Sequence, residues 1–185
     1  MSLRPTHLLR HEHRVIEQAL RALTGMCLNL ASGNPVPPEA LAQALDFIQI
    51  FADRFHHTRE EDVLFPALEQ AGFSQDEGAL HFLRDEHQLE RELLAELALT
   101  VAAYQTGEAG IAPRLIRAAN EYSKHLLSHM QKEDSLLFHL AEELLDENAK
   151  AALLQQLAPA HTASGSSLLH RYEQLATTLE NQWSV

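Results

Sequence analysis

An internal repeat constrains the fold of this chain more than any other feature. The segment LRHEH at 9–13 recurs as LRDEH at 83–87, and HHTREEDVLF at 56–65 recurs as HMQKEDSLLF at 129–138. The first pair lies 74 residues apart and the second 73, a difference that one loop residue absorbs. Each half of the chain thus carries the same two segments in the same order, and two related halves can pair about a pseudo-twofold axis.

The placement of glycine and proline predicts long helices. Turn-rich breaks at 32–38, 71–78 and 106–110 separate stretches rich in Ala, Leu, Glu, Gln and Arg, which are good helix formers. Short turns between long helices favour antiparallel neighbours. The predicted fold is therefore all-α: an up-down-up-down four-helix bundle at 1–145, with an additional C-terminal helical segment at 146–185 that packs on the bundle as one or two helices broken by PAHTASGSS. The four predicted bundle helices span about 5–31, 39–70, 78–105 and 111–145.

Histidine is unusually frequent, with 12 copies in 185 residues. Four of the histidines interrupt apolar stripes whose members are three or four residues apart, so they face the interior of the bundle. Two of these four are followed by a glutamate four residues later, on the same helix face. The six inward-facing residues are His13, His56, Glu60, His87, His129 and Glu133.

This set of side chains favours a pair of metal ions. An isolated buried carboxylate costs on the order of several kcal/mol, and bound cations remove that cost. Each ion takes two of the four histidines, and Glu60 and Glu133 bridge the two ions. We therefore expect two Fe ions, oxo- or hydroxo-bridged, each with an open position for a small molecule. Recombinant material can also contain Zn or Mn, because the affinity order alone does not favour Fe(II).

The register of the second helix has an alternative. His57 and Glu61 are also four residues apart, but the repeat favours His56 because the counterpart of His57 is Met130. Glu61 and Asp134 are assigned to a solvated edge or to a place behind the ligands, where they orient imidazoles through the free N–H.

Three further polar residues lie on these helix faces, and no catalytic residue is assigned among them. His125 lies one turn before His129 on the same face. It is expected to line an access path or to shuttle protons, or else to be a histidine at the end of the bundle. Tyr122 is interpreted as a core tyrosine, with hydrogen bonding to bound oxygen species as the alternative. Glu90 stands where the first half has Ile16, and it is assigned to the bundle rim ahead of a role as a ligand or proton donor.

With these residues in hand, the chain resembles the hemerythrin-like, or HHE, cation-binding family over about residues 5–145. The matching pieces are EHRVIEQAL, HHTREEDVLFP, DEHQLEREL and HMQKEDSLLF. The resemblance implies a four-helix bundle with a non-haem di-iron site that meets O2, NO or peroxide. Oxygen-carrying hemerythrins place a fifth histidine one turn after the first on the third helix, where this chain has Arg91. They also use an aspartate five residues after the fourth-helix histidine, where Asp134 follows Glu133. The four-histidine, two-glutamate set is closer to the branch that resembles iron-centre repair proteins, which carry a further cysteine-bearing domain.

Three functions are compatible with these features, and whether the protein is an enzyme stays open. The first is a di-iron protein that binds, senses or reacts with O2, NO or peroxide. The second is a di-iron oxidoreductase of the catalase or peroxidase kind. The third is a helical interaction module with a structural metal site. A ferritin-type site is less compatible, because ferritins use Glu-x-x-His and this chain has the reverse order at a longer spacing.

Composition excludes several other classes. The formal charge of −12 leaves no basic surplus for nucleic acid. A single cysteine, Cys27, excludes an internal disulfide and Cys-rich metal sites. No apolar stretch approaches the ~18 residues that span a bilayer, and the N-terminus lacks the apolar core of a signal peptide. A cytoplasmic location is the default expectation, and a homodimer is allowed.

Overall fold

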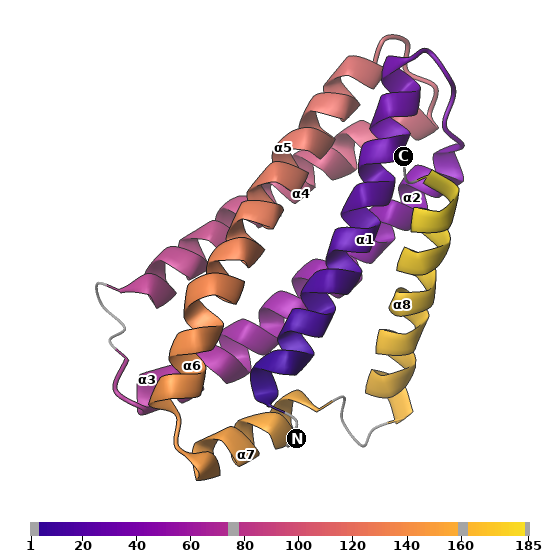
Figure 1. The fold of residues 1–185 in the computed structure, drawn as a ribbon. Helices are drawn as coiled ribbons and strands as arrows, with labels where there is room; N and C mark the ends of the chain where they lie inside the picture. Colours follow the sequence, from indigo (N-terminus) through magenta and orange to yellow (C-terminus); the bar gives the residue numbers. More distant parts are fainter. Residues whose placement is uncertain (1–3, 74–77, 159–162, 184–185) are drawn as a thin grey trace.

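The computed structural model of the chain describes residues 4–73, 78–158 and 163–183, and within them all regular structure is helical. The helices form four rods, each made of one or more consecutive helices, and each rod runs antiparallel to its neighbours in sequence (Figure 1). The rods form a closed ring, because the first and the third each contact both the second and the fourth. This confirms the predicted all-α bundle. The rods are α1 (Pro5–Ala31); α2 (Pro38–Phe47), η1 (Ile48–His57), η2 (Glu60–Leu64) and α3 (Phe65–Gln70); α4 (Ala79–Gln105); and α5 (Ala112–Lys132), η3 (Glu133–Leu137) and α6 (Phe138–Leu144).

Proline and glycine set the ends of the rods as the sequence predicts. Pro5 and Pro38 begin their helices, where a missing N–H has no cost. Gly33 follows the end of α1 with φ of 78°, a left-handed conformation that favours glycine. The predicted limits of all four rods therefore agree with the structure to within one or two residues.

The second and fourth rods contain π-helical turns, which the sequence pattern does not predict. The turn η2 begins at Glu60 and η3 begins at Glu133, which are equivalent positions of the repeat. A π turn closes an i→i+5 hydrogen bond instead of i→i+4, so it shifts the helix register, and such turns concentrate at functional sites. The two halves of the chain thus share a backbone irregularity as well as a sequence motif.

The apolar core is divided into two clusters with a polar layer between them. The lower cluster lies toward the start of α1 and contains Leu9, and the upper cluster lies toward the end of α1 and contains Ile16. His13 lies between these two residues on α1. On α4, Leu83 and Leu94 are separated in the same way. The histidines therefore occupy a layer inside the core and do not lie at its edge.

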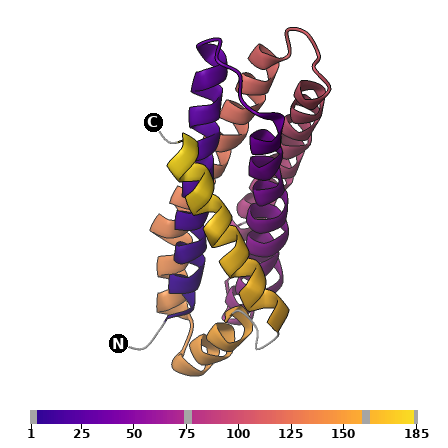
Figure 2. The ribbon, with the colours of Figure 1, turned by 90° about the vertical axis from the view of Figure 1, so that its right-hand side faces the viewer.

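The C-terminal segment forms two helices that pack on the bundle. Helix α7 (Glu147–Leu157) crosses the lower end and contacts α1 and η2, and α8 (Ala163–Trp183) lies along α1 and α2 (Figure 2). Residues 159–162 of the expected break lie outside the described residues. Helix α8 begins at Ala163, inside the expected break. The N–H groups of a first helical turn need no partner within the helix, so Ser and Gly are tolerated in that turn. The division of the chain at residue 145 into two units stays a prediction.

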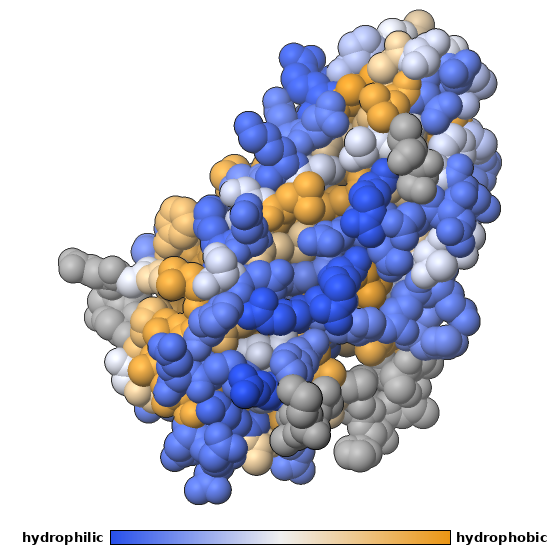
Figure 3. Space-filling model, viewed as in Figure 1, coloured by the Kyte–Doolittle hydropathy of each residue, from blue (hydrophilic) through white to orange (hydrophobic). Residues whose placement is uncertain are grey.

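The surface is largely hydrophilic over α1, α5 and α8, with hydrophobic side chains in separate areas (Figure 3). Leu127 and Leu136 are among the larger exposed apolar residues of the described chain. None of the described helices is both long enough and apolar enough to cross a membrane.

Candidate metal centre

The structure brings the six predicted side chains together in the polar layer of the core. Each comes from a different helical element, and each is at most 1% exposed. The first and third rods lie diagonally across the bundle and run in the same direction, as do the second and fourth, so the repeat-equivalent residues face one another across the bundle. The six residues and their elements are His13 (α1), His56 (η1), Glu60 (η2), His87 (α4), His129 (α5) and Glu133 (η3).

The histidines form two pairs. Nε2 of His13 lies 3.0 Å from Nε2 of His56, and Nε2 of His87 lies 2.9 Å from Nε2 of His129. The two Nε2 atoms of a histidine pair can share at most one proton. At least one of the two therefore carries a free lone pair that points into the polar layer. Such inward-directed lone pairs are suited to a metal ion.

Each glutamate reaches one histidine of each pair. The Glu133 carboxylate lies 3.3 Å from Nε2 of His13 and 3.2 Å from Nε2 of His129. The Glu60 carboxylate lies 3.6 Å from Nε2 of both His56 and His87. Both glutamates are therefore placed where a bridging ligand between two ions would be.

The donor atoms fit two cations. Both oxygens of Glu60 and of Glu133 are buried and make no hydrogen bond within the described residues. Two groups of four donors, each with its ligand atoms within 4.8 Å of one another, share these glutamates. Buried carboxylates without hydrogen bonds are costly, and a cation removes the cost. The first metal position is formed by His13, His56, Glu60 and Glu133, and the second by His87, His129, Glu60 and Glu133.

A carboxylate stands behind each of the four imidazoles. Each accepts a hydrogen bond from Nδ1, which fixes the tautomer that leaves the Nε2 lone pair facing the layer. The sequence assigned Asp134 and Glu61 either to a solvated edge or to this place behind the ligands, and the structure puts them here. Glu12 and Glu86 were missed, although each directly precedes a ligand histidine in the repeated segments LRHEH and LRDEH. The pairs are His13 with Asp134 (3.1 Å), His56 with Glu12 (2.9 Å), His87 with Glu61 (2.7 Å) and His129 with Glu86 (3.2 Å).

The repeat continues outside these carboxylates. Arg59 pairs with Glu12, and its counterpart Lys132 pairs with Glu86. Burial nevertheless raises the pKa of Glu12 to about 7, against the opposing charge of Arg59. The pseudo-twofold relation therefore extends through three layers of side chains: the ligands, the carboxylates behind them and the cations beyond.

The two glutamates titrate differently when no metal is bound. Burial, reinforced by the charge of Glu133, raises the pKa of Glu60 well above its usual range. Burial also acts to raise the pKa of Glu133, but the neighbouring His129 and His13 outweigh it and hold that pKa well below its usual range. Burial acts to lower the pKa of His129, but Glu133 and Glu86 outweigh it and raise that pKa well above its usual range. In the metal-free layer Glu60 is therefore biased toward its neutral form, and Glu133 toward its ionised form beside His129.

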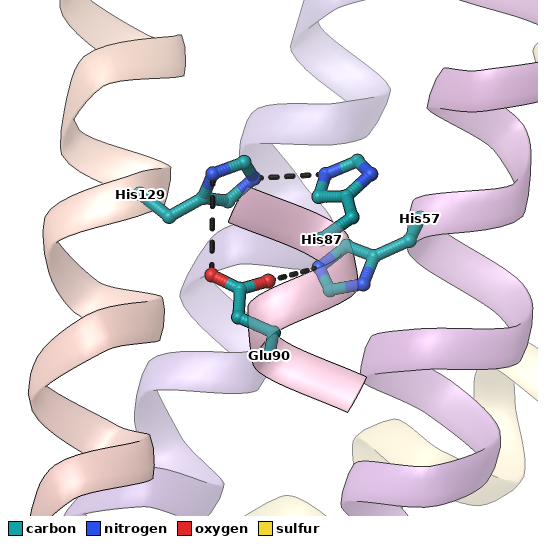
Figure 4. A group of neighbouring side chains, drawn as sticks. All are labelled: His57, His87, Glu90 and His129. Atoms are coloured by element: carbon teal, nitrogen blue, oxygen red, sulfur yellow. Dashed lines mark hydrogen bonds and ion pairs between the residues drawn. The ribbon is translucent and has the colours of Figure 1, made fainter. Parts of the chain in front are cut away.

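A further histidine and glutamate lie against the second position. His57 is 1% exposed and stacks on His87, with ring centroids 4.1 Å apart. Its Nε2 lies 3.3 Å from the carboxylate of Glu90, as Figure 4 shows. Glu90 is 1% exposed, so its assignment to the bundle rim is wrong: histidines of the neighbouring rods lie against its carboxylate. His125 contacts Glu90 at 3.0 Å and is partly exposed, and Tyr122 is buried.

Comparison with known proteins agrees with this centre. The family described as Hemerythrin HHE cation binding domain matches residues 4–141 and, in a second match, 78–182. The uncharacterized proteins Rv1995 of Mycobacterium tuberculosis and Mb2018 of Mycobacterium bovis are each 26% identical over 141 residues, or 76% of this chain and 54% of theirs. The chain thus spans about half the length of the curated relatives it matches. No solved structure matches the chain significantly. The buried His/Glu clusters and the family match together indicate a metal-binding site, and the chain belongs to the hemerythrin HHE cation-binding domain family.

Proposed function

We propose that this chain is a non-haem di-iron protein of the hemerythrin-like type that binds, senses or reacts with O2, NO or peroxide. The observation that supports this most is the pair of four-donor groups that share Glu60 and Glu133. Four protein donors leave part of the coordination shell of an iron ion free, and a small molecule needs that free position. The ligand histidines His13, His56, His87 and His129, and a cytoplasmic location, are part of the same proposal.

The chain's own residues prepare the centre for this chemistry. Two bound iron ions supply reversible binding or reduction of a small molecule. The carboxylates behind the imidazoles hold the rings in place, and the two apolar clusters keep bulk water from the layer. Asp134, directly behind His13, is 36% exposed at its side chain. The centre therefore lies one side chain below the surface, close enough for a small molecule to enter.

Elemental analysis of anaerobically purified protein tests the proposal. We expect about two iron ions per chain, one for each donor group, and a charge-transfer absorption that changes on exposure to O2, NO or peroxide. His87→Ala should lose iron. His81→Ala is the matched control, because this histidine lies on the same helix with a side chain that is 66% exposed. A natively folded protein that retains only traces of metal, or a loaded protein whose spectrum none of the three molecules changes, contradicts the proposal.

A further inference from the structure

His57 and Glu90 are buried polar groups that the six-residue set does not use. Neither ring nitrogen of His57 makes a well-formed hydrogen bond within the described residues, and the same holds for Oε2 of Glu90. A buried donor or acceptor without a partner has lost its hydrogen bonds to water and gained none in return, which destabilises a fold. Two such groups side by side in the core indicate a ligand that is bound between them and their neighbours.

Both groups converge on the second histidine pair. His57, His87, Glu90 and His129 each offer a ligand atom within 4.8 Å of the others, and all four residues are buried (Figure 4). Glu90 Oε1 lies 4.0 Å from Nδ1 of His129. His87 and His129 thus belong to two donor groups at once: one with the shared glutamates, and one with His57 and Glu90.

The first histidine pair has no such additional donors. At the repeat-equivalent positions the chain has Met130 in place of His57 and Ile16 in place of Glu90. Both are buried in the upper apolar cluster. Isoleucine offers no ligand, and a thioether is a poor ligand for a hard cation. The pseudo-twofold symmetry that holds for the ligands and the carboxylates behind them is broken at these two positions.

We propose that His57 and Glu90 are additional ligands of the metal ion held by His87 and His129, so that the two metal positions are unequal. The inference rests on the proposed function, because it requires two bound ions. With the shared Glu60 and Glu133, the two donor groups that contain His87 and His129 would offer the second position up to six protein ligands, whereas the first position has one group of four. The ion at the second position is therefore the more tightly held of the two.

Titration of metal-free protein with Co²⁺, in competition with a chromophoric chelator, tests the inference. We expect the wild type to bind two ions with affinities at least tenfold apart. The variants His57→Met and Glu90→Ile introduce the residues of the other half. Each should weaken the tighter ion about tenfold or more and leave the weaker ion unchanged. His81→Ala and Glu92→Gln, at exposed positions of α4, are the matched controls.

A second readout and a milder variant guard against misfolding. Glu90→Gln keeps the shape of the side chain and should show the same loss, with an unchanged far-ultraviolet circular dichroism spectrum. Visible absorption of the tighter Co²⁺ should rise as its coordination number falls. Two ions of equal affinity in the wild type, or variants that leave the tighter ion unaffected, overturn the inference and leave the proposed function intact. A wild type that binds no Co²⁺, Zn²⁺ or iron overturns both.

Discussion

At the scale of single residues, the carboxylates behind the imidazoles define the centre as much as the ligands do. Glu61 shows the reason. Burial alone acts to raise its pKa, but hydrogen bonds with His87 and Arg91 outweigh burial and lower the pKa to about 2. The carboxylate is therefore ionised at any working pH, and it holds the Nδ1 proton of His87 away from the metal-facing nitrogen.

Removing that charge should weaken metal binding. Glu61→Gln keeps an oxygen that can accept a hydrogen bond but removes the charge that makes the imidazole more basic. We expect a loss of about 10–100-fold in affinity at the second position, measured by the same Co²⁺ competition. Asp62→Asn changes a neighbouring exposed carboxylate and serves as the control. Equal affinities for Glu61→Gln and the wild type would show that the hydrogen bond does not orient the ring.

The sequence predicted which residues would meet, and it did so because two independent constraints agreed. Helical spacing placed six side chains inward, and the repeat selected His56 over His57 by comparing each with its counterpart. Glu90 shows the limit of this reasoning. Periodicity placed it on the stripe, but periodicity does not show which polar group a buried carboxylate meets across the bundle. That depends on the neighbouring rods, which bring His57 and His125 to it.

At the scale of elements, local signals predicted the rods and long-range packing determined the rest. Gly and Pro end helices through their own backbone preferences, so the limits of the rods could be predicted from sequence. The π turns at Glu60 and Glu133 could not, since no local propensity encodes an i→i+5 hydrogen bond. Each bridging glutamate is the first residue of such a turn.

The docking of α8 on α1 depends on Gly25. A Cβ at this position would overlap the backbone oxygen of Trp183, a clash that no side-chain movement can relieve. Helix propensity alone predicts that Gly25→Ala stabilises the protein by about 1 kcal/mol. We expect the opposite, a loss of roughly 2–3 kcal/mol, because the end of α8 must move away. Thermal unfolding and limited proteolysis of α8 measure it.

The neighbouring position provides the control for that prediction. Thr24→Ala lies on the same turn of α1 at an exposed site, and it should leave the melting temperature unchanged or slightly raised. A Gly25→Ala variant that melts at or above the wild-type temperature would show that α8 does not pack closely there.

At the scale of the whole molecule, the proposed metal ions would join the two halves of the repeat. The first position takes His13, His56 and Glu60 from the first half and only Glu133 from the second half. The second position has the reverse composition. Each half would thus hold its own ion and contribute one glutamate to the other position, so bound metal would cross-link the halves through the core.

Removing the metal should therefore destabilise the whole bundle rather than one helix. For ligand at about 1,000 times its Kd, linkage gives roughly 4 kcal/mol, and about 10 °C in melting temperature for a chain of this size. Calorimetry of loaded and chelator-treated protein measures the difference. A metal-free form with the same melting temperature would show that the layer is stable without ions.

The pH dependence of the metal-free protein separates the roles of the two glutamates. The folded-state pKa of Glu60 is raised above the usual 4.5. Its contribution to stability is thus fully present below pH 4.5 and is lost as the pH rises toward the folded-state pKa, at about 1 kcal/mol per pH unit. Glu60→Gln removes this titration, so its melting temperature should exceed that of the wild type by an amount that grows by roughly 2–4 °C per pH unit between pH 5 and 7.

Glu133→Gln should behave differently, because the ionised Glu133 is paired with His129 and its pKa is held below the usual range. Its contribution to stability is present above the usual pKa and is lost only as the pH falls through the lower folded-state value. Replacing it removes the ionised carboxylate beside Nε2 of His129 and leaves only Glu86 at Nδ1, so this variant should melt below the wild type at pH 7. If both variants raised the melting temperature equally, the two carboxylates would share the proton evenly, and the assignment of a neutral Glu60 beside an ionised Glu133 would be wrong.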